Sequence, residues 1–99
     1  MTSVPSTREA IRERLAGRNR AVIDAAQWFA YGHLDKGAYS EDGAVMVSSP
    51  YDVSSQVADL AFEMIDMLPD SPELTHALRR LIEAKDCFVR AAIAAGGPQ

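Results

Sequence analysis

The chain has 99 residues, of which 47% are hydrophobic and 24% charged, and its formal net charge at pH 7 is −4. These values are typical of one small globular domain spanning 1–99, and the acidic balance argues against binding to bulk nucleic acid or to a membrane surface. No apolar run approaches the length of a membrane span. A single cysteine and two histidines supply neither a disulfide nor a Cys/His zinc site, so we expect a reducing cytoplasm and no metal.

An N-terminal helix is expected over residues 7–31. Ser6 and Glu9 have the spacing of a capping box, and apolar residues recur at helical spacing from Ile11 to Phe29. Gly17 is the weak point of this pattern, because glycine lowers helix stability.

The helical pattern stops over residues 32–49. The cluster SEDG is typical of a turn, and the apolar run AVMV is long enough only for a small strand. We expect a connecting loop or a short β-hairpin here, with a binding loop as the further alternative.

An antiparallel helical hairpin is expected over residues 50–95, which makes the fold mainly α. Ser49-Pro50-Tyr51-Asp52 supplies an N-cap, a proline at the first helical position and an acid in the first turn. The segment 69–72, PDSP, ends this helix and caps the next, and so short a break places the two helices side by side. GGPQ ends the second helix near Ala95.

Each helix of this hairpin carries an apolar stripe that we expect to pack against the other. In the first helix the stripe comprises Val53, Val57, Leu60, Ala61, Met64 and Leu68. In the second it comprises Leu74, Ala77, Leu78, Leu81, Phe88 and Ala92.

Charge is distributed unevenly along the chain. Five arginines fall within residues 8–20, residues 24–73 hold ten acids and one base, and residues 79–90 are again rich in bases. This pattern favours an assembly in which the basic end of one chain meets the acidic middle of another. Salt bridges along the surface of each helix explain the same pattern.

The sequence contains no recognisable catalytic constellation, so we do not expect an enzyme, and we assign no catalytic, cofactor-binding or metal-binding residue. Asp59, Glu63 and Asp66 have a spacing at which a nucleotide-hydrolysing enzyme could hold a metal. A solvated acidic helix face is the commoner origin of such a pattern.

The last helix carries cations that need an explanation. Arg79 has Glu83 four residues later, and Asp86 has Arg90, so both arginines have a possible surface partner. Lys85 instead lies on the apolar stripe. Its ammonium group therefore either extends to solvent along the helix or meets an anion or a partner chain.

The stretch LPDSPELTHALRRLIEAKDCFVRAAIAA resembles the helical-hairpin domain of phage anti-defence sponge proteins. Such proteins counter the bacterial CBASS and Thoeris systems by sequestering their nucleotide messengers. The shared pattern is LPDS-x-E, a leucine-rich run and L-x-EAKD-x-x-VRAA, and the resemblance covers about residues 51–95. It implies a homo-oligomer, often a hexamer, acting in the host cell cytoplasm. Pockets between its protomers would bind cyclic dinucleotides, cyclic trinucleotides or cyclic ADP-ribose isomers without cleaving them.

The resemblance also implies that arginines and a lysine bind the phosphates and that aromatic rings stack on the bases. The alternative function is a small helical protein–protein interaction module with no small-molecule ligand. Tyr39 is added as a candidate from the composition of its own segment. The candidate ligand-binding residues are Tyr51, Arg79, Arg80, Lys85, Arg90 and Tyr39.

Overall fold

The computed structural model describes residues 4–34 and 49–96, and these ranges are mainly helical with no strand, which confirms the expected helical class. The elements are α1 (Arg8–Arg14), α2 (Arg20–Ala26), the short 3-10 helix η1 (Gln27–Phe29), α3 (Pro50–Met67) and α4 (Pro72–Gly96). Residues 35–48, where a short β-hairpin was one expectation, lie outside the described residues. Among the helices described, none combines the length and the apolarity that a bilayer crossing requires.

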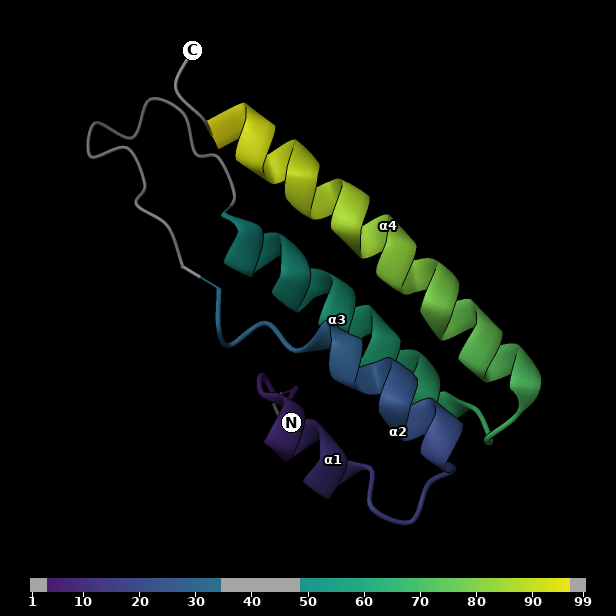
Figure 1. The fold of residues 1–99 in the computed structure, drawn as a ribbon. Coiled ribbons are helices and arrows are strands. Elements are labelled where there is room, and N and C mark those ends of the chain that lie inside the picture. Colours follow the sequence, from purple (N-terminus) through teal and green to yellow (C-terminus); the bar gives the residue numbers. More distant parts are fainter. Residues whose placement is uncertain (1–3, 35–48, 97–99) are drawn as a thin grey trace.

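α3 and α4 lie side by side and antiparallel, joined by a short connection (Figure 1). A capping box starts α3: Ser49 Oγ accepts from the Asp52 N–H at 3.1 Å, and the Asp52 carboxylate accepts from the Ser49 N–H at 3.2 Å. At the start of α4, Ser71 Oγ accepts from the Leu74 N–H at 3.1 Å. The chain therefore turns back where the sequence supplies helix caps.

The single helix predicted over residues 7–31 is wrong, because the chain breaks between α1 and α2. α1 ends with Leu15 as its C-cap, and Gly17 then adopts a φ of +95°, a conformation that side chains other than glycine rarely tolerate. Asn19 caps α2 by accepting from the Ala21 N–H at 2.8 Å. A glycine followed by a capping residue is thus sufficient to interrupt an otherwise continuous apolar pattern.

The start of α1 also differs from the expected capping box. Thr7, not Ser6, caps the helix, and its hydroxyl accepts from the Ala10 N–H at 3.1 Å. The Ser6 carbonyl instead accepts from the N–H groups of Tyr31 and Gly32 at 2.9 and 2.8 Å. This contact ties the entry to α1 to the segment that follows η1.

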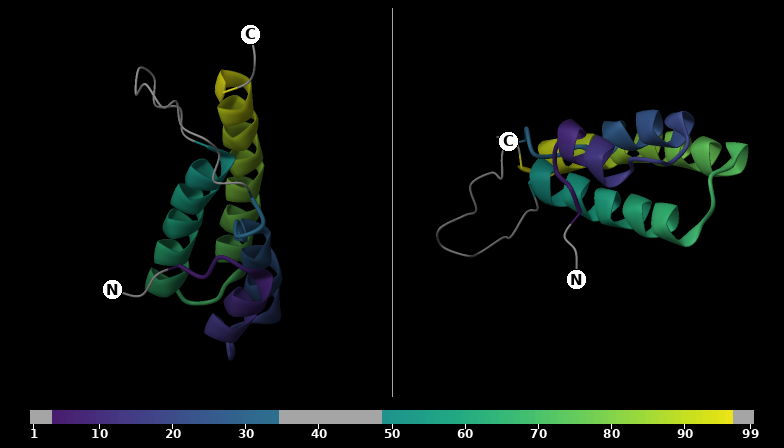
Figure 2. Two further views of the ribbon diagram at one scale, coloured as in Figure 1. Left: turned by 90° about the vertical axis from the view of Figure 1, so that its left-hand side faces the viewer. Right: turned by 90° about the horizontal axis from the view of Figure 1, so that it is seen from below.

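α1, α2 and η1 pack against the α3–α4 pair and close one hydrophobic core (Figure 2). Every described helix contributes to it. The largest of its fully buried side chains, from α1, α2, η1, α3 and α4 respectively, are Ile11, Val22, Phe29, Phe62 with Ile65, and Leu78.

The face that α3 buries is rotated from the predicted stripe. Of that stripe only Ala61 is buried, whereas Leu60 and Leu68 are 44% and 45% exposed. Small side chains allow neighbouring helices to approach closely, and they occupy much of the face that does pack. The buried residues of α3 are Ser54, Ala58, Ala61, Phe62 and Ile65.

α4 departs from its predicted stripe in the same manner. Leu74 and Leu78 are buried as expected, but Ala77 is exposed and Phe88 is 55% exposed. An apolar surface therefore remains outside the core on both helices.

Arg18 lies in the connection between α1 and α2, and its side chain binds the connection between α3 and α4. We call these two connections the corners of the fold. Its Nε donates to Asp70 Oδ1 at 2.6 Å, and its two terminal nitrogens donate to the carbonyls of Ile65 and Leu68, each at 2.9 Å. Asp70 Oδ2 accepts from the Asn19 N–H at 2.6 Å. The guanidinium group thus satisfies carbonyls at the C-terminal end of α3, where the helix dipole favours a cation.

A second ion pair holds α1 to the last turns of α3. Arg14 Nη2 lies 2.6 Å from Asp66 Oδ2, and the guanidinium carbon lies 5.1 Å from the centre of the Phe62 ring. Charge pairing and a cation–π contact therefore act at the same place.

Replacing Arg18 by methionine tests the contact between the two corners. Arg18→Met leaves both carbonyls without their charged donor, so we expect a loss of about 2 kcal/mol in unfolding free energy, measured by urea denaturation. Arg20→Met is the matched control, because its side chain is 92% exposed and its nearest carboxylate, Asp24, is 3.8 Å away. A control effect equal to that of Arg18→Met would contradict this role.

The same contact predicts a pH dependence. The Asn19 N–H, acting against partial desolvation and helped by Arg18, holds the pKa of Asp70 below its ordinary value of 3.8. A lowered carboxyl pKa stabilises the fold above the unfolded-state pKa, and this stabilisation is lost as pH falls through the folded-state value. The wild type should therefore melt higher than Asp70→Asn above about pH 5, and the difference should shrink on acidification. A difference that grows on acidification would refute the assignment.

Candidate functional site

The predicted arginines of α4 are on the surface, but their partners differ from those expected. Arg80, not Arg79, pairs with Glu83, at 3.0 Å. Arg90 donates to the thiol sulfur of Cys87 at 3.3 Å instead of pairing with Asp86. The three-residue and four-residue spacings are both close on a helix, so the sequence alone does not distinguish these pairings.

Lys85 has an intramolecular partner that the sequence did not indicate. It is partly buried, and its Nζ donates to the backbone carbonyl of Trp28 at 2.6 Å, which links α4 to η1. Burial lowers the pKa of Lys85, and the neighbouring carboxylate of Asp86 opposes that shift. The ammonium group is thus engaged in a hydrogen bond within the chain, and an anion would have to compete with the Trp28 carbonyl for it.

Tyr51 lies at the start of α3 against another tyrosine. The rings of Tyr31 and Tyr51 meet edge to face, with 5.1 Å between centroids and 80° between planes. Burial, followed by the proximity of Tyr51 and Asp59, raises the pKa of Tyr31. Tyr39, the other aromatic candidate, lies outside the described residues.

Those predicted site residues that the structure describes are therefore not gathered in one place within the chain. Arg79 lines a surface hollow of about 500 Å³ beside the two corners joined by Arg18, and the other described candidates do not line it. This volume is within the range of small-molecule sites. The other residues around the hollow are Asn19, Ala21, Asp70, Ser71, Pro72, Thr75 and His76.

Most residues of the hollow were not predicted as ligand-binding. His76 lies one helical turn before Arg79 and Arg80, which was the available signal, whereas Asn19 comes from the distant α1–α2 corner. The contact between Arg18 and Asp70 brings that corner to α4. No sequence pattern indicates a contact between residues so far apart.

The hollow has a mixed electrostatic character. Arg79 makes no ion pair or hydrogen bond with any residue of the described ranges, so its charge is available to a ligand. Asp70 contributes a carboxylate, but Arg18 and the Asn19 N–H already bind both of its oxygens. The arrangement can bind an anionic or polar molecule.

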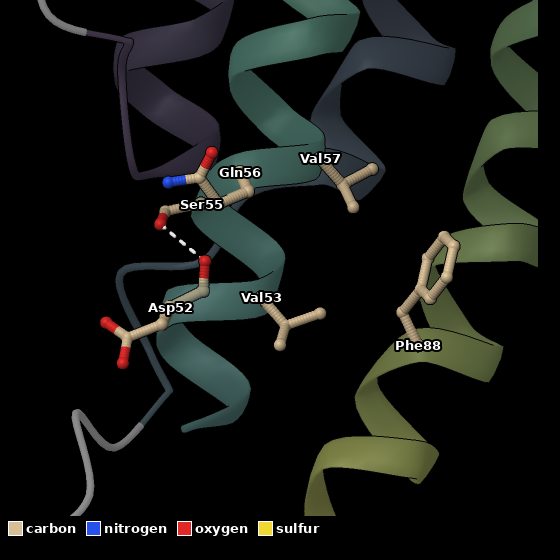
Figure 3. A pocket seen from close by; sticks show the side chains of 6 residues that line it. All are labelled: Asp52, Val53, Ser55, Gln56, Val57 and Phe88. Carbon is tan, nitrogen blue, oxygen red and sulfur yellow. Dashed lines mark hydrogen bonds between the residues drawn. The ribbon is translucent and has the colours of Figure 1, made fainter. Parts of the chain in front are cut away.

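A second hollow, of about 520 Å³, lies between α3 and α4 (Figure 3). Val53 and Val57 of α3 point toward Phe88 of α4, whereas the polar side chains of Asp52 and Gln56 point away from α4. The part of this hollow that faces α4 is therefore apolar and suits a hydrophobic side chain better than a phosphate.

Cys87 is exposed in the middle of α4. Within residues 4–34 and 49–96 no group of three or more His, Cys, Asp or Glu side chains is placed to hold a metal ion.

Comparison with known proteins gives no relative: no protein-family model, curated protein or solved structure matches this chain.

The Lys85 contact predicts a structural cost of its own. Lys85→Met keeps most of the apolar stem but removes the donor to Trp28, so we expect a loss of about 1 kcal/mol in unfolding free energy. Arg80→Gln, which breaks only the exposed pair with Glu83, should cost less than about 0.5 kcal/mol. Equal or greater stability of Lys85→Met in urea denaturation would contradict the contact.

Proposed function

We propose that this protein is a non-catalytic sequestering protein for anionic nucleotide messengers. Its ligand class is cyclic dinucleotides, cyclic trinucleotides or cyclic ADP-ribose isomers, and its setting is phage anti-defence in the host cytoplasm. The sequence resemblance over about residues 51–95 suggests this function, and the single structural observation that supports it is Arg79. This arginine has no ion pair or hydrogen bond with another residue of the described ranges, and it lines a hollow of about 500 Å³.

The proposal includes self-assembly, with a hexamer as the form that the resemblance suggests. Within one chain, Arg80, Lys85 and Arg90 each have another contact, and none of them lines the hollow with Arg79. A nucleotide with two or three phosphates needs several cations around it. A second chain would supply them and would also enclose a ligand that one small chain leaves exposed.

A helical interaction module is the second candidate, and a different observation favours it. Leu60 and Met67 lie two turns apart on one face of α3 and are 44% and 72% exposed, and such rows of exposed apolar side chains on a helix are typical of protein-binding surfaces. The partner of such a module would be an amphipathic helix with basic flanks, because α3 carries four acids and no base.

A binding panel tests the messenger proposal. Purified protein is titrated with cyclic dinucleotides, cyclic trinucleotides and cyclic ADP-ribose isomers, and the melting temperature is followed by differential scanning fluorimetry. We expect one class to raise the melting temperature and to be recovered chemically intact after heat denaturation. Absence of a shift with every member would reject sequestration, and recovery of a cleaved product would show an enzyme instead.

Substitution of two neighbouring arginines tests whether the ligand binds in the hollow. Arg79→Gln should raise the Kd of the panel ligand about 10- to 100-fold, since it removes a charged donor to a phosphate. Arg80→Gln removes the same charge one residue away, outside the hollow, and should change the Kd less. The reverse ranking would move the binding site away from the hollow, and circular dichroism checks that both variants remain folded.

A further inference from the structure

Two apolar stripes flank the line along which α3 and α4 lie side by side, and most of their residues lie outside the core, against which Val57 and Leu81 pack. On each helix the residues recur at alternating intervals of three and four, the spacing of coiled-coil seams. We call these residues together the seam surface. They are Val53, Val57, Leu60, Met64 and Met67 of α3, and Ala77, Leu81, Ala84, Phe88, Ala91 and Ala95 of α4.

The seam surface faces solvent in the single chain. Leu60, Met67 and Phe88 are 44%, 72% and 55% exposed, and every other member is exposed or only partly buried. The two stripes belong to one surface, because Val53, Val57 and Phe88 line the same hollow and point toward one another (Figure 3).

The size of this surface matches what an interface between two chains requires. A helix of 18 residues is about 27 Å long, and two helices side by side are about 20 Å wide. The footprint of the helix pair is therefore roughly 500 Å² per chain, so two copies packed over it would bury about 1,000 Å², where specific interfaces begin.

The distribution of charge on α3 and α4 indicates which partner covers the seam surface and how the two copies are oriented. α3 contains four acids and no lysine or arginine, whereas α4 contains four bases and three acids. A two-fold axis across the helices would place α3 on α3, with acids facing acids. A two-fold axis parallel to the helices places α3 of one copy on α4 of the other, antiparallel, so that the acidic helix meets the more basic one.

This second arrangement also fixes a specific contact. Val53 and Val57 both line a hollow with Phe88, so residues of α3 and α4 whose numbers sum to about 143 are nearly level with each other. Glu63 is thus nearly level with Arg80. Glu63 borders the stripe of α3, and Arg80 borders the stripe of α4, in both cases on the side away from the core. A two-fold axis parallel to the helices places Glu63 of one copy next to Arg80 of the other.

The geometry points to a homodimer in which two seam surfaces pack into an antiparallel four-helix bundle, with Glu63 of each copy against Arg80 of the other. Glu63 makes no ion pair with another residue of the described part of the chain. Arg80 pairs only with Glu83, its own neighbour, and both of these side chains remain mostly exposed. Exchange of Glu83 for Glu63 of the partner subunit therefore costs little. The inference does not depend on the messenger proposal and is tested without a ligand.

Sedimentation equilibrium of the full chain tests the surface. We expect a mass of two 10.8 kDa chains or an even multiple. Phe88→Asp should weaken association about 100-fold while leaving the helical content unchanged by circular dichroism, because Phe88 is mostly exposed in the single chain. Ile93→Asp is the matched control, since Ile93 is equally exposed but lies off both stripes. A wild-type mass of one chain, or equal weakening by both variants, would overturn the inference.

Charge reversal tests the arrangement. Glu63→Arg should weaken association about tenfold through repulsion with Arg80 of the partner subunit, and Arg80→Glu should do the same. The double variant should recover most of the loss, because the pair is restored with the charges exchanged. If the loss of association free energy in the double variant equals the sum of the losses in the two single variants, then α3 does not pack on α4 of the other copy.

Discussion

The hydrogen bonds of one guanidinium group hold the two corners of this fold together. Arg18 reaches from the α1–α2 corner to the carbonyl groups that end α3 and to the carboxylate of Asp70. Arg14 and Lys85 add directional contacts elsewhere between the N-terminal half and the α3–α4 pair, whereas the surrounding apolar contacts do not by themselves fix the angle of approach. The hollow that contains Arg79 depends on the Arg18 contact, since its walls come from both corners.

Local signals in the sequence were sufficient to locate the two helices of the second half along the chain. Ser49 and Pro50 mark the start of α3, and the segment 69–72 marks the break before α4, because caps and prolines act on the adjacent backbone alone. The N-terminal half was harder to predict. Its apolar residues keep helical spacing across the break, so periodicity indicated one helix where Gly17 and Asn19 separate two.

The candidate site was less predictable, since its features depend on contacts between distant segments. Lys85 was predicted on the apolar stripe and is partly buried, but its acceptor is the backbone carbonyl of Trp28, which no sequence pattern indicates. The orientation of α3 was missed for another reason. Its apolar arc is wide and includes Phe62 and Ile65 as well as Val53 and Val57, so periodicity alone does not say which part of the arc faces the core.

The separation of Arg18 from its partners along the chain also bears on how the molecule folds. α3 and α4 are consecutive, so their pairing closes only a short loop, whereas Arg18 lies 47–52 residues from the groups it binds. Contacts between neighbours form quickly and distant contacts later, because loop closure costs more entropy as the loop grows. The α3–α4 pair is thus the natural first unit of folding, and the N-terminal half docks afterwards. In the native protein the N-terminal half should be the first part to unfold locally. Its amide hydrogens should therefore exchange with solvent before those of α3.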